Sequence, residues 1–184
     1  MRKITGSDIE YEQLYKSYFK KFFNYGKKFT KDACLVEDSI QEVFLDAWHK
    51  RIKAVEIQSP NSYYFSSFRY ILFKKIKQAI NTIELDQQDD EPEFSVEQKM
   101  IAGEISSEQL MKIQEGLKKL TSRQREAIFL RFYEGLSFEE VAAVLNISVK
   151  ATYKIMARSL ENLRENMSLT LAHLILLMTL PALY

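Results

Sequence analysis

The chain of 184 residues is poor in cysteine and in the residues that interrupt regular structure. It has 5 glycines, 3 prolines and a single cysteine, Cys34. So few glycines and prolines leave too few turns for a fold of many short strands, which favours helices. One cysteine cannot form an internal disulfide, and the opening MRKITGSDIEYEQ has no apolar run after its two basic residues. We therefore expect no secretory signal and a cytoplasmic protein.

The residues that most enzymes need are also scarce. The two histidines, His49 and His173, lie in different segments and belong to no metal-ligand pattern. No glycine-rich phosphate loop or nucleophile elbow is present. Cys34 has no histidine close to it in the sequence, so we interpret it as a small packing residue. We expect no enzymatic activity, no metal and no cofactor.

The net charge of the chain is also small, but the charges are unevenly distributed along the sequence. The chain has 26 basic and 25 acidic residues, a net charge of +1. Residues 1–83 carry +6, residues 84–115 carry −8 and residues 116–184 carry +3. The acidic segment opens with ELDQQDDEPEF, whose proline and clustered carboxylates are typical of an exposed linker. We expect an all-α protein with two small helical domains, 8–83 and 116–166, joined by the linker 84–115.

Three helices are predicted in the first basic segment. Apolar residues recur at helical spacing over 11–29, with one face formed by Leu14, Tyr18, Phe22 and Tyr25. A second helix is predicted over 36–52, and a third from about Ser62 to Ile83, after the loop marked by Ser59, Pro60 and Asn61. In the second helix the apolar face is formed by Ile40, Val43, Phe44 and Ala47, whereas Asp38, Gln41, Glu42 and His49 lie away from it.

The third helix combines aromatic and basic residues. Six aromatic residues lie within eleven positions, and no acidic residue occurs between Glu56 and Glu84. The aromatic residues are Tyr63, Tyr64, Phe65, Phe68, Tyr70 and Phe73, and the basic residues are Arg69, Lys74, Lys75 and Lys77. Six exceed what one buried stripe uses, so the surplus is suited to stacking on unpaired bases. A core role for the aromatic residues is an equally good interpretation of the composition.

The second basic segment carries the signals of a helix-turn-helix. Thr121 with Gln124 and Ser137 with Glu140 each form a predicted capping box, and Gly135 with Leu136 ends the helix of about 122–134. The next helix is short and stops at Asn146, which adopts the left-handed conformation more readily than most residues. Ser148 then caps a helix whose predicted apolar side is Val149, Thr152, Met156, Leu160 and Leu163. Two short capped helices around a tight turn are typical of this motif.

Basic residues follow one stripe of that last helix. Lys150, Lys154 and Arg158 are each four residues apart, so they share one stripe opposite the apolar side. Such a stripe alone is common on solvated helices. Within a helix-turn-helix it favours contact with phosphates and base edges in the major groove.

Two stretches resemble regions of a known family. DSIQEVFLDAW, Asp38 to Trp48, resembles the Asp-x-x-Gln-Glu-x-Phe-x-x-x-Trp core of region 2 in bacterial sigma factors of the sigma-70 family. The segment from Leu120 to Arg164 resembles their region 4. With only a linker between the two, the chain is similar to the short extracytoplasmic-function (ECF) group. The resemblance implies a sigma factor that binds core RNA polymerase and recognises and helps melt promoter DNA.

The resemblance also implies partners and roles for residues. Asp38, Gln41 and Glu42 would dock on the clamp helices of the largest polymerase subunit, and the flap would be a further contact. The loop from Val55 and the helix after it would hold the melted strand of the minus-ten element, through Tyr63, Tyr64, Arg69, Tyr70, Lys74, Lys75 and Lys77. The last helix would read the minus-thirty-five element, through Ser148, Lys150, Lys154 and Arg158. The linker would run towards the RNA path, an anti-sigma factor would be a further partner, and no small-molecule substrate is implied.

Some positions depart from the family pattern, and one alternative function stays open. Tyr70 stands where many members have asparagine, Lys74 where an acid is frequent, and Asn146 where the turn usually has glycine. A helix-turn-helix regulator that does not bind polymerase would explain the second segment, but not the polar face of Asp38, Gln41 and Glu42. The apolar tail, 167–184, has no counterpart in the pattern: it either packs on one domain or bridges both and covers a binding surface.

Overall fold

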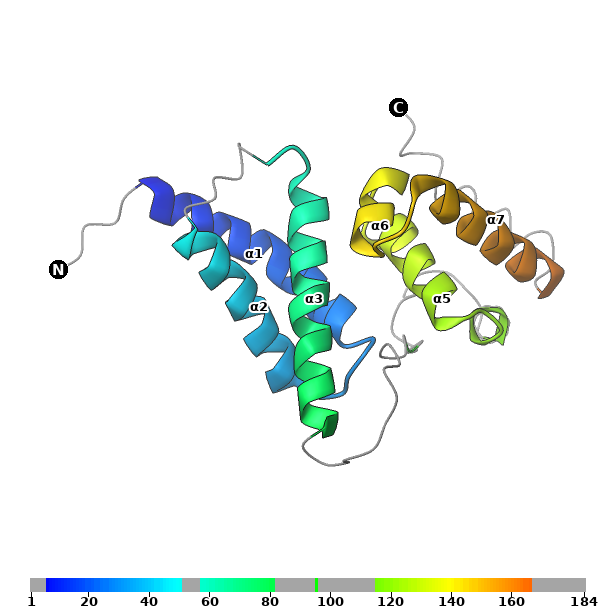
Figure 1. Cartoon of the computed structure of the whole chain (residues 1–184), viewed down its shortest axis with the longest axis horizontal. Helices are drawn as coiled ribbons and strands as arrows, with labels where there is room; N and C mark the ends of the chain where they lie inside the picture. The colour runs from blue at the N-terminus through cyan, green and yellow to red at the C-terminus, as the bar shows by residue number, and fades with distance from the viewer. Residues whose placement is uncertain (1–5, 51–56, 82–94, 96–114, 167–184) are drawn as a thin grey trace, which may run out of the picture. The chain divides into compact units, whose positions relative to one another are not determined.

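The computed structural model describes residues 6–50, 57–81, 95 and 115–166, in two compact units, Met1–Glu93 and Phe94–Tyr184 (Figure 1). Every regular element in the described residues is helical, which confirms the all-α prediction. Most of the predicted linker and all of the predicted tail lie outside these residues. Among the helices described, none is long and apolar enough to cross a membrane.

The first unit is built from three helices. They are α1 (Gly6–Gly26), α2 (Ala33–His49) and α3 (Pro60–Asn81), and each packs on the other two (Figure 1). The predicted second helix begins three residues too late, because Asp32 caps α2 by accepting a hydrogen bond from the Leu35 amide at 3.1 Å. The third also begins earlier than predicted, since Pro60 is preorganised for the first position of a helix.

Aromatic side chains hold the first unit together. Phe22 of α1 stacks on Phe68 of α3 with ring centroids 4.6 Å apart, and neither ring is exposed to solvent. Phe65 meets Phe22 edge-on at 5.0 Å, and Tyr64 stacks on Phe44 of α2 at 5.6 Å. Each ring removes roughly 150–250 Å² of surface from water, so this cluster contributes a large apolar contact between the three helices.

Gly26 allows the end of α1 to approach α2. A Cβ atom at this position would lie 2.7 Å from Val36 Cγ1 and 3.1 Å from the Phe68 ring, closer than atoms in a packed core approach. The missing side chain therefore sets the spacing of α1, α2 and α3 at this end of the unit.

The second unit has four named elements. They are α5 (Ser122–Ile128), the π-helical turn η3 (Phe129–Tyr133), α6 (Phe138–Val144) and α7 (Val149–Asn166), preceded by a helical turn at 115–118. The predicted helix of about 122–134 is thus α5 continued by a wider turn, in which the Glu134 amide donates to the Phe129 carbonyl at 3.1 Å. Gly135 follows with a φ of 74°, as expected for a glycine that ends a helix.

Local hydrogen bonds define the helix-turn-helix. Both capping boxes, Thr121 with Gln124 and Ser137 with Glu140, are present as predicted. Asn146 has a φ of 51°, and the Ile147 amide donates to the Ala142 carbonyl at 2.9 Å. This pattern is a Schellman motif with asparagine in the position that glycine usually takes.

The buried side of α7 differs from the predicted one at its first residue. Thr152, Met156 and Leu163 are buried as predicted, and Leu160 is half-buried. Val149 is 37% exposed, so its prediction as a core residue is wrong. The first turn of α7 follows directly on the α6–α7 turn and stays at the surface, and burial begins only at Thr152.

Candidate polymerase and nucleic-acid interfaces

The basic residues predicted on α7 lie on its exposed face. Lys150, Lys154 and Arg158 are all exposed, and among the described residues none of them makes an ion pair. The opposite face is buried, and its two hydroxyl groups, those of Thr152 and Ser159, donate to carbonyls of their own helix. One side of α7 therefore serves the core while the other presents cations to solvent.

Hydrogen bonds hold both ends of α6. The Ser137 hydroxyl accepts from the Glu140 amide at 3.1 Å, and Arg123 of α5 donates to the Leu145 carbonyl, where α6 ends, at 3.1 Å. The pKa of the exposed Glu139 carboxyl is lowered by hydrogen bonds from its own backbone amide and from Ser137. The Arg123 contact ties the end of α6, where the turn to α7 begins, to α5. Arg123 was not singled out from the sequence because its acceptor lies 22 residues away.

Ser148 has a structural task beside its predicted contact with DNA. Its hydroxyl oxygen accepts from the Ala151 amide at 3.2 Å and so caps α7. The residue is exposed at the beginning of the helix. Among the described residues this hydroxyl donates to no acceptor, so it can donate a hydrogen bond to a phosphate.

The exposed face of α7 contains one residue that the sequence interpretation missed. Tyr153 is 51% exposed and lies on the stripe of Lys150 and Lys154, three residues after the first. Its ring stacks on Phe138 of α6, with ring centroids 4.3 Å apart. The spacing of three residues from Lys150 indicates this position, although the aromatic residues predicted to contact nucleic acid all lie in the first segment.

On α2, polar and apolar side chains share one exposed strip. Asp38 and Gln41 are exposed as predicted, and the same strip continues through Leu45 and Trp48, which are 55% and 39% exposed. Tyr11 of α1 supports Trp48 edge-on at 4.8 Å. An exposed strip with large apolar residues among polar ones is suited to a protein partner. Leu45 was missed because the sequence pattern assigned only polar residues to this face.

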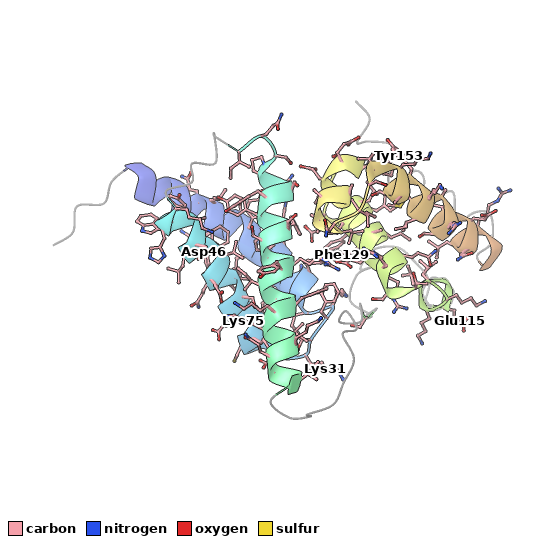
Figure 2. All side chains as sticks on the ribbon, viewed as in Figure 1. Lys31, Asp46, Lys75, Glu115, Phe129 and Tyr153 are labelled. Carbon is pink, nitrogen blue, oxygen red and sulfur yellow. The ribbon has the colours of Figure 1, made fainter. Side chains whose placement is uncertain are left out.

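Glu42 and Lys75, predicted for two different partners, contact each other. Glu42 Oε2 lies 3.0 Å from Lys75 Nζ, with 42% and 26% of the two side chains exposed. Lys75 thus lies on the side of α3 that faces α2 (Figure 2). Neither group is fully available to a partner until this ion pair opens.

Two of the residues predicted to hold single-stranded DNA are core residues. Tyr64 has no exposed surface and packs between Tyr18 and Phe44, so it cannot stack on a base while the helices stay packed. Arg69 is only 9% exposed and lies over the Phe73 ring at 4.1 Å. Both assignments are corrected, because the packing of α1 and α2 on α3 uses the face that carries them.

The remaining predicted residues form a strip along α3. Tyr70 is 71% exposed and Lys74 is exposed, while Tyr63 and Lys77 are half-buried. Their spacing of seven, four and three residues places all four on one side of the helix. Within the described stretches, no group of three histidine, cysteine or acidic side chains could hold a metal ion.

Comparisons with known proteins match this architecture. Residues 110–163 match the family model described as Sigma-70, region 4. The ECF RNA polymerase sigma factor SigK of Mycobacterium tuberculosis (strain ATCC 25618 / H37Rv) is 24% identical over 174 residues, covering 88% of this chain and 90% of SigK. SigX of Bacillus subtilis (strain 168), also an ECF RNA polymerase sigma factor, is 27% identical over 168 residues, covering 86% and 84%. Over most of its length the chain is therefore similar to ECF sigma factors of the sigma-70 family.

The fold of the chain agrees with a solved structure of a sigma factor. The sigma factor RpoE of Bartonella quintana, crystallised with the anti-sigma factor NepR, matches with a TM-score of 0.59 at 16% identity, over 85% of this chain and 95% of RpoE. The helix-turn-helix of the second unit is the DNA-binding region 4 of the family. ECF sigma factors direct transcription and are not enzymes.

Proposed function

We propose that this chain is an ECF sigma factor that binds core RNA polymerase and directs promoter-specific initiation, and that it recognises promoter DNA and helps to melt it. The observation that carries the proposal is the extent of the similarity to SigK, 88% of this chain, which takes in both units. A regulator that only binds DNA needs a helix-turn-helix and has no use for the strip on α2.

The strip on α2 is the proposed docking surface for polymerase. Asp38 and Gln41 offer polar groups, and Leu45 and Trp48 offer apolar surface, on one side of a rigid helix. Core polymerase would contact this strip with the clamp helices of its largest subunit, and its flap would contact the second unit. Glu42 would take part once it separates from Lys75.

The strips on α3 and α7 are the proposed DNA surfaces. Tyr63 and Tyr70 would stack on unpaired bases of the minus-ten element, while Lys74 and Lys77 hold the backbone. Lys150, Lys154, Arg158 and Ser148 would contact the duplex of the minus-thirty-five element. In this assignment residues 8–83 act as region 2, 84–115 as an acidic linker and 116–166 as region 4. An anti-sigma factor, such as the one that RpoE binds, would compete for these surfaces.

Run-off transcription with purified core polymerase on genomic fragments tests the proposal. We expect transcripts that begin at discrete positions and depend on this chain. Replacing Gln41 by Ala should reduce association with core, whereas Gln13→Ala, an exposed glutamine on α1, should not. Duplex binding without core association and without transcripts would favour the alternative, a helix-turn-helix regulator.

A further inference from the structure

Tyr153 is the largest side chain on the exposed stripe of α7. It lies between Lys150 and Lys154 on that stripe and keeps 51% of its surface exposed, although it is aromatic. A single exposed aromatic residue is common on protein surfaces, but this one lies within a row of cations on a helix whose opposite side fills the core. Thr152 and Met156, on the opposite side of α7, fill that core.

The ring of Tyr153 is held in place by two other elements. It stacks on Phe138, the first residue of α6, at 4.3 Å and an interplanar angle of 23°. Arg131 of η3 lies over the Phe138 ring at 4.9 Å, and its guanidinium donates to the Leu136 carbonyl at 2.7 Å. Because each group restricts the next, Tyr153 is preorganised, and little side-chain freedom remains to be lost when it meets a partner.

We propose that Tyr153 is a specificity-determining residue that reads a thymine in the major groove through contact of its ring with the 5-methyl group, and that Phe138 positions it. The inference rests on the proposed entry of α7 into promoter DNA. The flanking lysines carry charge, which attracts phosphates of any sequence. A ring edge instead distinguishes thymine, because only thymine presents a methyl group in that groove.

The chain offers a matched control. Tyr133 is 48% exposed and stacks on Phe129 at 4.8 Å and 27°, so it resembles Tyr153 in exposure and in ring contact. It lies on η3, outside the α6–α7 motif. Loss of this ring tests the effect of removing any exposed, stacked tyrosine from the unit.

Selection from a randomised duplex pool, with the full chain alone and bound to core polymerase, tests the proposal. Tyr153→Ala should lose the preference for thymine at one or two adjacent base pairs by about tenfold and keep the other preferences. Tyr153→Phe and Tyr133→Ala should select as the wild type does. Phe138→Ala should weaken the preference at the same base pairs, and Phe138→Tyr, which keeps the ring, should restore it.

Replacing the selected thymine by uracil in the bound duplex removes only the methyl group. The wild type should then bind about fourfold more weakly, as for one lost buried methyl group, and Tyr153→Ala should bind both duplexes equally. The proposal is overturned if Tyr153→Ala keeps the thymine preference, or if the wild type and Tyr153→Ala discriminate between thymine and uracil to the same extent. It is also overturned if Tyr153→Phe binds all sequences more weakly by the same factor, because that result indicates a contact of the hydroxyl with phosphate. Absence of any selection by the wild type overturns it together with the proposed DNA contact. Failure to bind core, with selection by the chain alone intact, refutes only the polymerase assignment.

Discussion

The two units of the chain place their predicted binding residues differently with respect to the core. In the second unit, α7 has one buried side and one basic exposed side, and the two sets of residues do not overlap. In the first unit, α3 uses aromatic residues for both purposes, so Tyr64 lies in the core while Tyr70, less than two turns later, is exposed. A binding surface made of the same residue types as the core can be located only when the packing is known.

The units also differ in what holds them together. The first has few caps and a cluster of stacked aromatic rings, whereas the second has two capping boxes and a Schellman turn around short helices. We expect the first unit to respond most to changes in its core and the second to respond also to changes in single hydrogen bonds at its helix ends.

The largest expected effect is on the aromatic core of α3. Phe68→Ala should lower the free energy of unfolding of the first unit by about 3–5 kcal/mol, because it leaves a cavity beside Phe22. Tyr70→Ala, two residues later and 71% exposed, should change it by less than about 0.5 kcal/mol. Trp48 is the one tryptophan of the chain, so its fluorescence in urea reports on this unit alone. Equal effects of the two changes would show that core and surface are not separated along α3 as described.

The next effect concerns the basic stripe of α7. Replacing Lys150 and Lys154 by Ala should weaken binding to all duplex sequences and reduce the slope of log affinity against log salt by about one for each lost phosphate contact. Both side chains are exposed, so thermal stability should not change. Lys118→Ala, an exposed lysine of the same unit before α5, is the control. An unchanged salt slope in the double variant would mean that the stripe does not touch DNA.

A smaller effect is expected at the capping box of α6. Ser137→Ala removes the acceptor of the Glu140 amide and should destabilise the second unit by about 1 kcal/mol. Ser137→Thr keeps the hydroxyl acceptor, so it should destabilise the second unit less than Ser137→Ala does. Circular dichroism on heating reports on the helices of both units, whereas Trp48 fluorescence reports on the first unit. The lower stability of the variant should therefore shift the circular dichroism transition and leave the fluorescence transition unchanged. A shift of both would indicate that the units unfold together.

The accuracy of the sequence interpretation follows the range of the interactions involved. Both capping boxes and the left-handed Asn146 were predicted because each depends on residues close together in the chain. The burial of Tyr64 was not, since it depends on Phe44 and Tyr18, which lie 20 and 46 residues earlier in the chain. The burial of Arg69 was not predicted either. The exposure of Val149 was not predicted either: this residue has an apolar side chain at a helical position typical of the core, but it is the first residue of α7 and stays at the surface.

The candidate binding residues follow the same rule as the fold: those that depend on local spacing were predictable, and those that depend on contacts between helices were not. The exposed stripe of Lys150, Lys154 and Arg158 followed from helical spacing, because the capping signals fixed where α7 begins. The contact of Glu42 with Lys75 joins residues 33 positions apart on two helices, and no local pattern indicates it. Sequence alone therefore placed these two residues on separate surfaces.

The smallest expected effect is on that contact. Because both side chains are partly exposed, a double-mutant cycle with Glu42→Gln and Lys75→Met should give a coupling energy between about 0.2 and 1 kcal/mol, lower at high salt. Glu42→Gln should also release Lys75 from its ion pair. The affinity of the Glu42→Gln variant for a single-stranded oligonucleotide should therefore rise, by less than about fivefold. The association of the same variant with core polymerase should fall. Asp46→Asn, which removes the ion pair with Lys50 on the same helix, is the control and should leave the oligonucleotide affinity unchanged. If Glu42→Gln binds the oligonucleotide no better than the wild type, Lys75 is not held back from DNA by Glu42, and the two strips of the first unit act independently, as the two faces of α7 do.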